Sequence, residues 1–151
     1  MDNLFRIQSI IEPLYLGFQG YILVFSSEHS LRKVGLRQTR YGSEDLLKRA
    51  LSNLLINAID YGFENQDIVI TTKSTADYVD IEVLTKNIFI DKQHLNHLFE
   101  RFYQIDSSRH SKAKTGGLGL SIVKSIMMLH NGEANVHNSQ QGVVFRLRIK
   151  Y

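Results

Sequence analysis

Two asparagines and an aspartate share one stretch of sequence that has the spacing of a helix. Asn53 and Asn57 are four residues apart, which places them one above the other on a helix surface, and Asp60 follows beside them. They lie at the edge of an apolar stripe. Asparagine is a poor helix former and is costly to bury without partners. We therefore expect a polar ligand or a polar partner to lie against these two amides.

A glycine cluster is the second group of residues that could do chemistry. Gly116-Gly117-Leu118-Gly119-Leu120 follows a polar loop, residues 106–115, and precedes an apolar helical pattern. Glycines let backbone N–H groups approach a ligand, and a helix start offers unpaired donors at the positive end of its dipole. This is the chemistry of a phosphate site. A glycine cluster alone fits a flexible turn with tight helix packing equally well.

The elements that must position these groups can be read from hydrophobic periodicity. Residues 43–62 are predicted to form one amphipathic helix, with Ser43 as its N-cap and acidic residues in its first turn. The alternation of apolar and polar residues predicts strands elsewhere. The sum is an α+β fold with a mostly antiparallel sheet and helices on one face. Strands are expected at 21–25, 67–72, 78–84, 133–137 and 143–149, further helices at 3–14, 91–98 and 117–129, and residues 31–40 are ambiguous.

Composition restricts the class of protein. The chain has 151 residues, of which 43% are hydrophobic and 22% charged, as expected for one globular domain. No apolar run is long enough to span a membrane, and no signal peptide is visible. The absence of cysteine excludes disulfides, thiolate metal sites and a cysteine nucleophile. The net charge of +3 comes without a basic stripe, so we expect no nucleic-acid partner.

Three signals in a fixed order resemble a known family. They are Asn53-x-x-x-Asn57, the run Leu98-Phe99-Glu100-Arg101-Phe102-Tyr103, and the glycine cluster before Ser121-Ile122-Val123-Lys124. Together they resemble the N box, F box and second glycine box of the ATP-binding domain of sensor histidine kinases, in the GHKL superfamily. Residues 98–131 look most like the heavy-metal (copper-type) branch, and the resemblance covers 41–151. It implies the Bergerat fold, a two-layer sandwich of a mixed, mostly antiparallel sheet with about three helices on one face.

The resemblance also implies ATP and Mg²⁺ as ligands. Asn57 matches the asparagine that binds Mg²⁺, and its carbonyl oxygen suits that ion. Asn53 matches the residue that approaches the phosphates or their metal. Phe99 and Phe102 are expected to be core residues that anchor a lid. Four basic residues lie in or beside that lid, and we expect one or two of them to contact phosphate: Arg101, Arg109, Lys112 and Lys114. The residues implied to bind ATP are Asn53, Asn57, Asp60, Tyr61, Thr85, Asn87, Ile90, Arg101, Lys112, Gly117, Leu118, Gly119 and Leu120.

Departures from the family pattern affect both ends of the implied ligand. The first glycine box of the family, Asp-x-Gly-x-Gly, aligns with Thr85, Asn87 and Phe89. Threonine can still accept a hydrogen bond from adenine, and Asn87 tolerates a left-handed backbone. Asp60 stands where the family carries Lys or Arg, so it repels a triphosphate unless it serves as a second metal ligand, and Thr115 replaces the first glycine of the second box. We therefore hypothesise weak ATP affinity.

The implied activity is transfer of the γ-phosphoryl group of ATP to a histidine on a separate dimerisation hairpin of the same kinase. A response regulator is the implied second partner, and the cytoplasm is the implied location. We do not expect His29 to be the phosphoacceptor, because it follows a predicted strand. No phosphoacceptor hairpin is therefore expected within residues 1–151. No catalytic residue can be assigned, and the isolated domain is not expected to autophosphorylate. The alternatives are a pseudokinase interaction domain that binds ATP weakly or not at all, and a GHKL serine kinase, against which the F box argues.

Overall fold

The computed structural model describes residues 23–28, 44–63, 66–105 and 116–150. Several expectations fall outside these residues: the helix at 3–14, the segment 31–40, the cap Ser43, and the loop 106–115 with Arg109, Lys112, Lys114 and Thr115. Within the described residues, no helix has the length and apolar character needed to cross a membrane.

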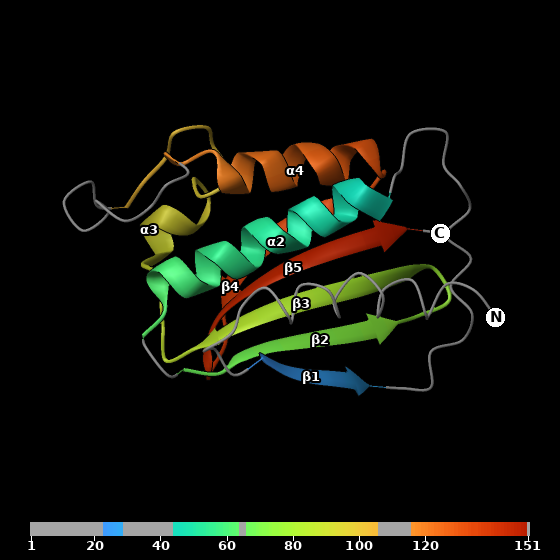
Figure 1. Cartoon of the computed structure of the whole chain (residues 1–151), viewed down its shortest axis with the longest axis horizontal. Coiled ribbons are helices and arrows are strands. Elements are labelled where there is room, and N and C mark those ends of the chain that lie inside the picture. Colours follow the sequence, from blue (N-terminus) through green and yellow to red (C-terminus); the bar gives the residue numbers. More distant parts are fainter. Residues whose placement is uncertain (1–22, 29–43, 64–65, 106–115, 151) are drawn as a thin grey trace.

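A sheet of five strands forms one layer of the described structure (Figure 1). Along the sheet the strands follow the order β1-β2-β3-β5-β4. β1 runs parallel to β2, whereas each of the other neighbouring pairs is antiparallel. The expected mixed and mostly antiparallel sheet is therefore confirmed. The bounds are β1 Leu23–Glu28, β2 Ile68–Ser74, β3 Tyr78–Lys86, β4 Glu133–Asn138 and β5 Gly142–Lys150.

Helices form the second layer, on one face of the sheet (Figure 1). They are α2 (Glu44–Tyr61), the short α3 (Lys92–Leu95) and α4 (Gly119–Leu129). The amphipathic helix expected at 43–62 thus forms almost over its full predicted length, with Glu44 and Asp45 in its first turn. α4 packs beside α2, so the asparagines of α2 and the glycine-opened start of α4 belong to neighbouring helices.

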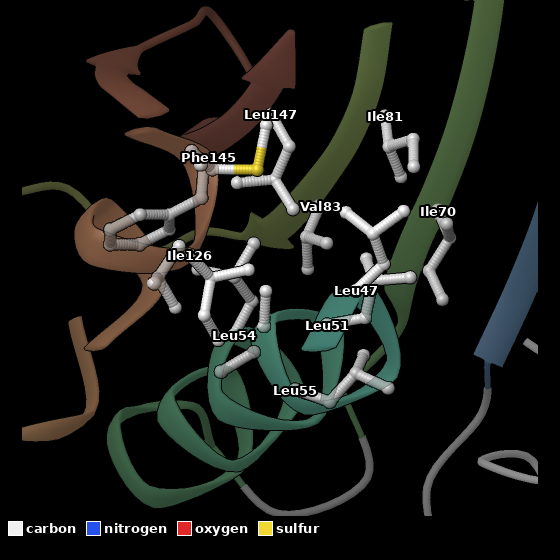
Figure 2. Packing of buried hydrophobic residues seen from close by; sticks show 14 of the residues in the cluster. Leu47, Leu51, Leu54, Leu55, Ile70, Ile81, Val83, Ile126, Phe145 and Leu147 are labelled. Atoms are coloured by element: carbon white, nitrogen blue, oxygen red, sulfur yellow. The ribbon is translucent and has the colours of Figure 1, made fainter. Parts of the chain in front are cut away.

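The core lies between α2, α4 and the sheet. Figure 2 shows leucines of α2, among them Leu51 and Leu54, directed at the inner face of β3 and β5. On β3, Val79, Ile81 and Val83 are almost fully buried, as the alternating pattern predicted. Burying a side chain of this size stabilises the fold by about 1.5–3 kcal/mol. This packing fixes α2 above the sheet and so fixes where Asn53 and Asn57 point.

The region after β3 differs from expectation in two ways. The helix predicted to run from Asp91 to Leu98 ends at Leu95, and the Asp91 side chain makes no capping hydrogen bond. Beyond Leu95 the backbone bonds connect residues three apart, with His97 N–H donating to His94 O and Glu100 N–H to His97 O, which makes successive turns instead of an α-helix. Phe102, expected to be core, is 70% exposed and has a φ of 65°.

Candidate functional site

A pocket of about 590 Å³ opens between the C-terminal half of α2, the end of β3, the start of β5 and the start of α4. Most of the residues selected from sequence meet there, although they come from segments far apart in the chain. Its floor is apolar and includes Leu98 and Phe145. Of the residues expected to bind ATP, those in its lining are Asn53, Asn57, Asp60, Tyr61, Thr85, Asn87, Ile90, Gly117, Gly119 and Leu120.

The asparagines of α2 and the glycine cluster lie side by side in the lining of this pocket. The Asn53 side-chain Nδ2 donates to the Gly119 carbonyl oxygen at 3.3 Å. This bond joins α2 to the first residue of α4 over 66 positions of sequence. Asn57, one turn further along α2, also lines the pocket. For Asn53, the expected polar partner is therefore the backbone at the start of α4.

The glycine cluster is shaped by two different requirements. Gly117 has a φ of +78°, and a Cβ there would lie 3.0 Å from the backbone of Phe102, whose N–H donates to Gly117 O. At Gly119 an added Cβ would meet no protein atom within 4 Å, although the residue lines the pocket. Gly117 is thus needed for the protein's own packing, whereas the space beside Gly119 is open. The first N–H groups of α4 have no acceptor within the helix.

Another part of the pocket lining comes from the end of β3 and the turn that follows. Thr85 is buried there, with 2% of its surface exposed. Asn87 has a φ of 57°, the left-handed conformation that its identity allowed us to expect, and its N–H donates to Gln141 O at 2.8 Å. Phe89 lines the pocket but remains 59% exposed.

Ile90 is fixed by a pair of hydrogen bonds with one side chain. Its N–H donates to Asn138 Oδ1 at 3.1 Å, and Asn138 Nδ2 donates back to Ile90 O at 2.7 Å. Because Asn138 is the last residue of β4, this pair ties the pocket wall to the edge of the sheet. The segment from Asn87 to Ile90 is therefore held at both ends, by the Gln141 carbonyl oxygen at Asn87 and by the Asn138 side chain at Ile90.

Tyr61 lies at the end of α2 and is 37% exposed. Partial burial raises the pKa of its hydroxyl above the ordinary value, and the neighbouring Asp60 carboxylate raises it further. The hydroxyl therefore remains protonated at neutral pH. Gly62 ends the helix: its N–H donates to Ala58 O at 2.9 Å, and a Cβ there would lie only 2.5 Å from that oxygen.

A side wall of Tyr103, Gln104 and Ile105 was missed by sequence reasoning. The Tyr103 hydroxyl and His94 Nδ1 are 2.6 Å apart, and the ring also lies 5.5 Å from the ring of His97, which is itself bonded to Glu100. These contacts hold the wall in place. Among the residues that the structure describes, no three His, Cys, Asp or Glu side chains gather to hold a metal ion by themselves.

Three of the residues selected from sequence are not in the pocket lining. Arg101 and Leu118 line a second, smaller groove of about 310 Å³, together with Phe102 and Arg49. Lys112 belongs to the segment that is not described. Tight turns after α3 carry Arg101 away from the pocket, a consequence of backbone geometry that spacing alone does not reveal.

The pocket offers oxygen donors of the kind that a hard cation prefers. The Asn57 amide oxygen and the Asp60 carboxylate come from positions three apart on α2, so they lie on the same side of the helix. Mg²⁺ is bound in proteins by one or two such groups, completed by waters and substrate phosphates. The side chains present therefore fit Mg²⁺.

Comparison with known proteins identifies the class. Residues 42–151 match the family model of histidine kinase-, DNA gyrase B- and HSP90-like ATPases, and the chain belongs to this family. The matched residues include all three sequence boxes and every residue that lines the pocket. ATP is the nucleotide of this family.

Within that family the chain is a domain of the sensor histidine kinase type. It is 39% identical over 115 residues to the sensor histidine kinase CusS of Escherichia coli K12, covering 76% of this chain and 24% of that protein. It is 35% identical over 108 residues to the probable sensor kinase SilS of Salmonella typhimurium, covering 72% and 22%. The chain thus spans about a quarter of the length of the curated relatives it matches. The recognition made from the three boxes is confirmed.

Solved structures confirm the fold. The catalytic domain of histidine kinase ThkA superposes with a TM-score of 0.76 at 25% identity, covering 96% of this chain and 92% of that one. ThkA in complex with the response regulator TrrA gives a TM-score of 0.73 at 24% identity, covering 95% and 40%. The two-layer sandwich expected from the resemblance is therefore the observed architecture.

Proposed function

We propose that this chain binds Mg-ATP in the pocket and presents the γ-phosphoryl group to a histidine on a separate helical hairpin. One observation carries the proposal: the amides of α2 and the glycine-opened start of α4 line the same open pocket, where the Asn53 side chain bonds directly to Gly119 O. Phosphates in this pocket can lie against both the side-chain amides and the backbone N–H groups at the start of α4. The open pocket gives no support to a nucleotide-free interaction domain.

The pocket residues divide into a phosphate end and a base end. At the phosphate end, Asn57 would hold Mg²⁺ and Asn53 would lie beside the phosphates, which Gly117, Gly119 and Leu120 would contact through backbone N–H groups. Mg²⁺ would offset phosphate charge there. At the base end, Tyr61, Thr85, Asn87 and Ile90 would surround the nucleobase. Leu118 and Arg101 face the second groove, so we assign them no side-chain contact with the bound nucleotide.

The catalytic role of the chain is to bind and to orient. Phosphoryl transfer depends mostly on positioning and on electrostatic stabilisation, which a rigid pocket with fixed donors supplies. No side chain in the described part of the chain is assigned as a general base. We propose that residues 1–151 form one catalytic domain, and that this is the cytoplasmic domain of an inner-membrane sensor kinase. The two partners would be the histidine hairpin and a response regulator, the latter supported by the ThkA–TrrA complex.

Mg-ATP should raise the melting temperature of this chain. A ligand that binds only the folded state at about 100 times its Kd adds about 2.7 kcal/mol to the free energy of unfolding, or about 5–10 °C for a domain of this size. Differential scanning fluorimetry with Mg-ATP, Mg²⁺ alone and Mg-AMP checks this. No shift at millimolar Mg-ATP would remove the nucleotide-binding function and revive the pseudokinase alternative.

The acceptor is tested separately. With radiolabelled ATP, label should appear on a supplied histidine hairpin and should be acid-labile, as a phosphohistidine is. Replacing the acceptor histidine of that hairpin by glutamine is the control. Acid-stable label on a serine-containing substrate, with none on the hairpin, would favour the serine-kinase alternative instead.

Gly119→Ala should weaken Mg-ATP binding without weakening the fold. Its Cβ would meet no protein atom, and alanine is the better helix former by about 1 kcal/mol, so stability should hold or rise slightly. The added methyl group would occupy the side of the pocket where phosphate approaches, and we expect Kd to rise about tenfold. Calorimetry measures the affinity, and thermal melting of the unliganded variant measures the fold. An unchanged Kd would show that phosphates do not approach Gly119.

A further inference from the structure

Charge in the pocket has the wrong sign for a free nucleotide. Of the described residues that line it, Asp60 is the one that carries a formal charge, and that charge is negative. The other described lining groups are amides, hydroxyls, backbone and apolar side chains. A triphosphate placed at the start of α4 therefore meets a carboxylate on α2, where like charges repel.

A divalent cation resolves this conflict only when the nucleotide is present. Asp60 and Asn57 together offer fewer oxygen ligands than Mg²⁺ requires, and no cluster of three metal-binding side chains exists among the described residues. Phosphate oxygens would have to complete the coordination shell. The cation and the triphosphate should consequently bind as a unit, with the cation between the carboxylate and the phosphates.

We propose that Asp60, acting with Asn57, makes this pocket selective for the metal complex of a nucleoside triphosphate and excludes the metal-free triphosphate. This inference rests on the proposed function, because it assumes that the pocket takes ATP. It goes beyond that function in assigning a specificity to Asp60, which lies in the last turn of α2 three residues after Asn57. The interaction depends on where the carboxylate lies, so it does not require that Asp60 be without a protein partner.

The test is a comparison of two dissociation constants, measured by calorimetry with ATP in Mg²⁺ and with ATP in EDTA. For the unaltered chain we expect the Kd in EDTA to exceed the Kd in Mg²⁺ by about 100-fold or more. In Asp60→Asn that ratio should fall about tenfold, because the amide no longer repels the metal-free nucleotide and holds the cation less strongly. Asp60→Glu, which keeps the charge, should retain most of the ratio.

Two controls separate this effect from general changes in charge and folding. Asp77→Asn removes an equal charge from the exposed turn between β2 and β3, away from the pocket, and should leave the ratio unchanged. Asp60 is exposed, so the variant is expected to fold, and melting temperatures without ligand check this.

The possible outcomes are distinct. If the ratio of the Kd in EDTA to the Kd in Mg²⁺ is the same for Asp60→Asn as for the unaltered chain, the inference is overturned. Nucleotide binding itself is not affected by that result. Equal affinities of the unaltered chain in Mg²⁺ and in EDTA also overturn it. If the unaltered chain binds ATP under neither condition, the proposed function fails and the inference fails with it. A fall in the ratio for Asp60→Asn but not for Asp77→Asn supports it.

Discussion

Replacing Asn57 by alanine should reduce the affinity for Mg-ATP by about 100-fold or more, the largest loss of binding that we expect from one side chain. Asn57 lines the pocket and supplies an oxygen that suits Mg²⁺, and alanine leaves no oxygen at that place. The metal would then lose a protein ligand at the point where it offsets the phosphate charge. Calorimetry with Mg-ATP measures the affinity directly.

The fold should tolerate this change. Asn57 is only partly buried, and alanine favours a helix, so the melting temperature of the unliganded Asn57→Ala chain should match or slightly exceed that of the parent. Ser52→Ala is the matched control, since Ser52 lies on the same helix but outside the pocket lining, and its Kd should not change. If Asn57→Ala binds Mg-ATP as tightly as the parent chain, Asn57 is not the residue that holds Mg²⁺.

Local patterns were sufficient to predict most of the fold. The apolar stripe of α2 and the alternation of β3 and β5 depend only on residues near in sequence, and all three elements form where periodicity places them. Two groups of site residues could also be predicted, because asparagine and glycine lower the stability of a helix and so indicate a functional or packing role there. The two amides and the glycine cluster therefore identified part of the pocket lining from sequence alone.

The remaining walls depend on contacts between distant segments. Tyr103 reaches the pocket because turns after α3 redirect the chain and because His94 holds its hydroxyl. The same turns send Arg101 to the second groove and leave Phe102 exposed, contrary to the expectation that it is core. Neither periodicity nor motif spacing specifies the direction of the chain through irregular turns. The sequence box from Leu98 to Tyr103 therefore does not by itself show which of its side chains line the pocket.

Gly142 shows a further kind of feature that the sequence did not reveal. It begins β5 with a φ of +146°, and a Cβ there would lie 2.1 Å from the carbonyl oxygen of Thr85. It would also lie 3.0 Å from Asn87 N. Backbone atoms of β3 and β5 approach this closely only because Gly142 has no side chain. Thr85 and Asn87 line the base end of the pocket, so the position of that wall depends on this glycine.

Gly142→Ala should therefore cause the largest loss of stability among the substitutions considered. The unfavourable backbone conformation and the overlap with Thr85 O together should lower the free energy of unfolding by about 2–5 kcal/mol, which is about 5–15 °C in melting temperature. The surviving folded protein should also bind Mg-ATP less tightly, because the wall formed by Thr85 and Asn87 must move. Thermal or urea unfolding measures the first effect, and calorimetry below the melting temperature measures the second.

Gly116→Ala is the control that separates the two causes. Gly116 also has a left-handed φ, of +56°, but an added Cβ there would meet no atom within 4 Å. It should cost about 1 kcal/mol from backbone strain alone. If both variants lose the same small amount of stability, the close approach to Thr85 O is not what Gly142 protects. A much larger loss of stability at Gly142, accompanied by weaker Mg-ATP binding, would show that the close approach of β3 and β5 positions the wall formed by Thr85 and Asn87.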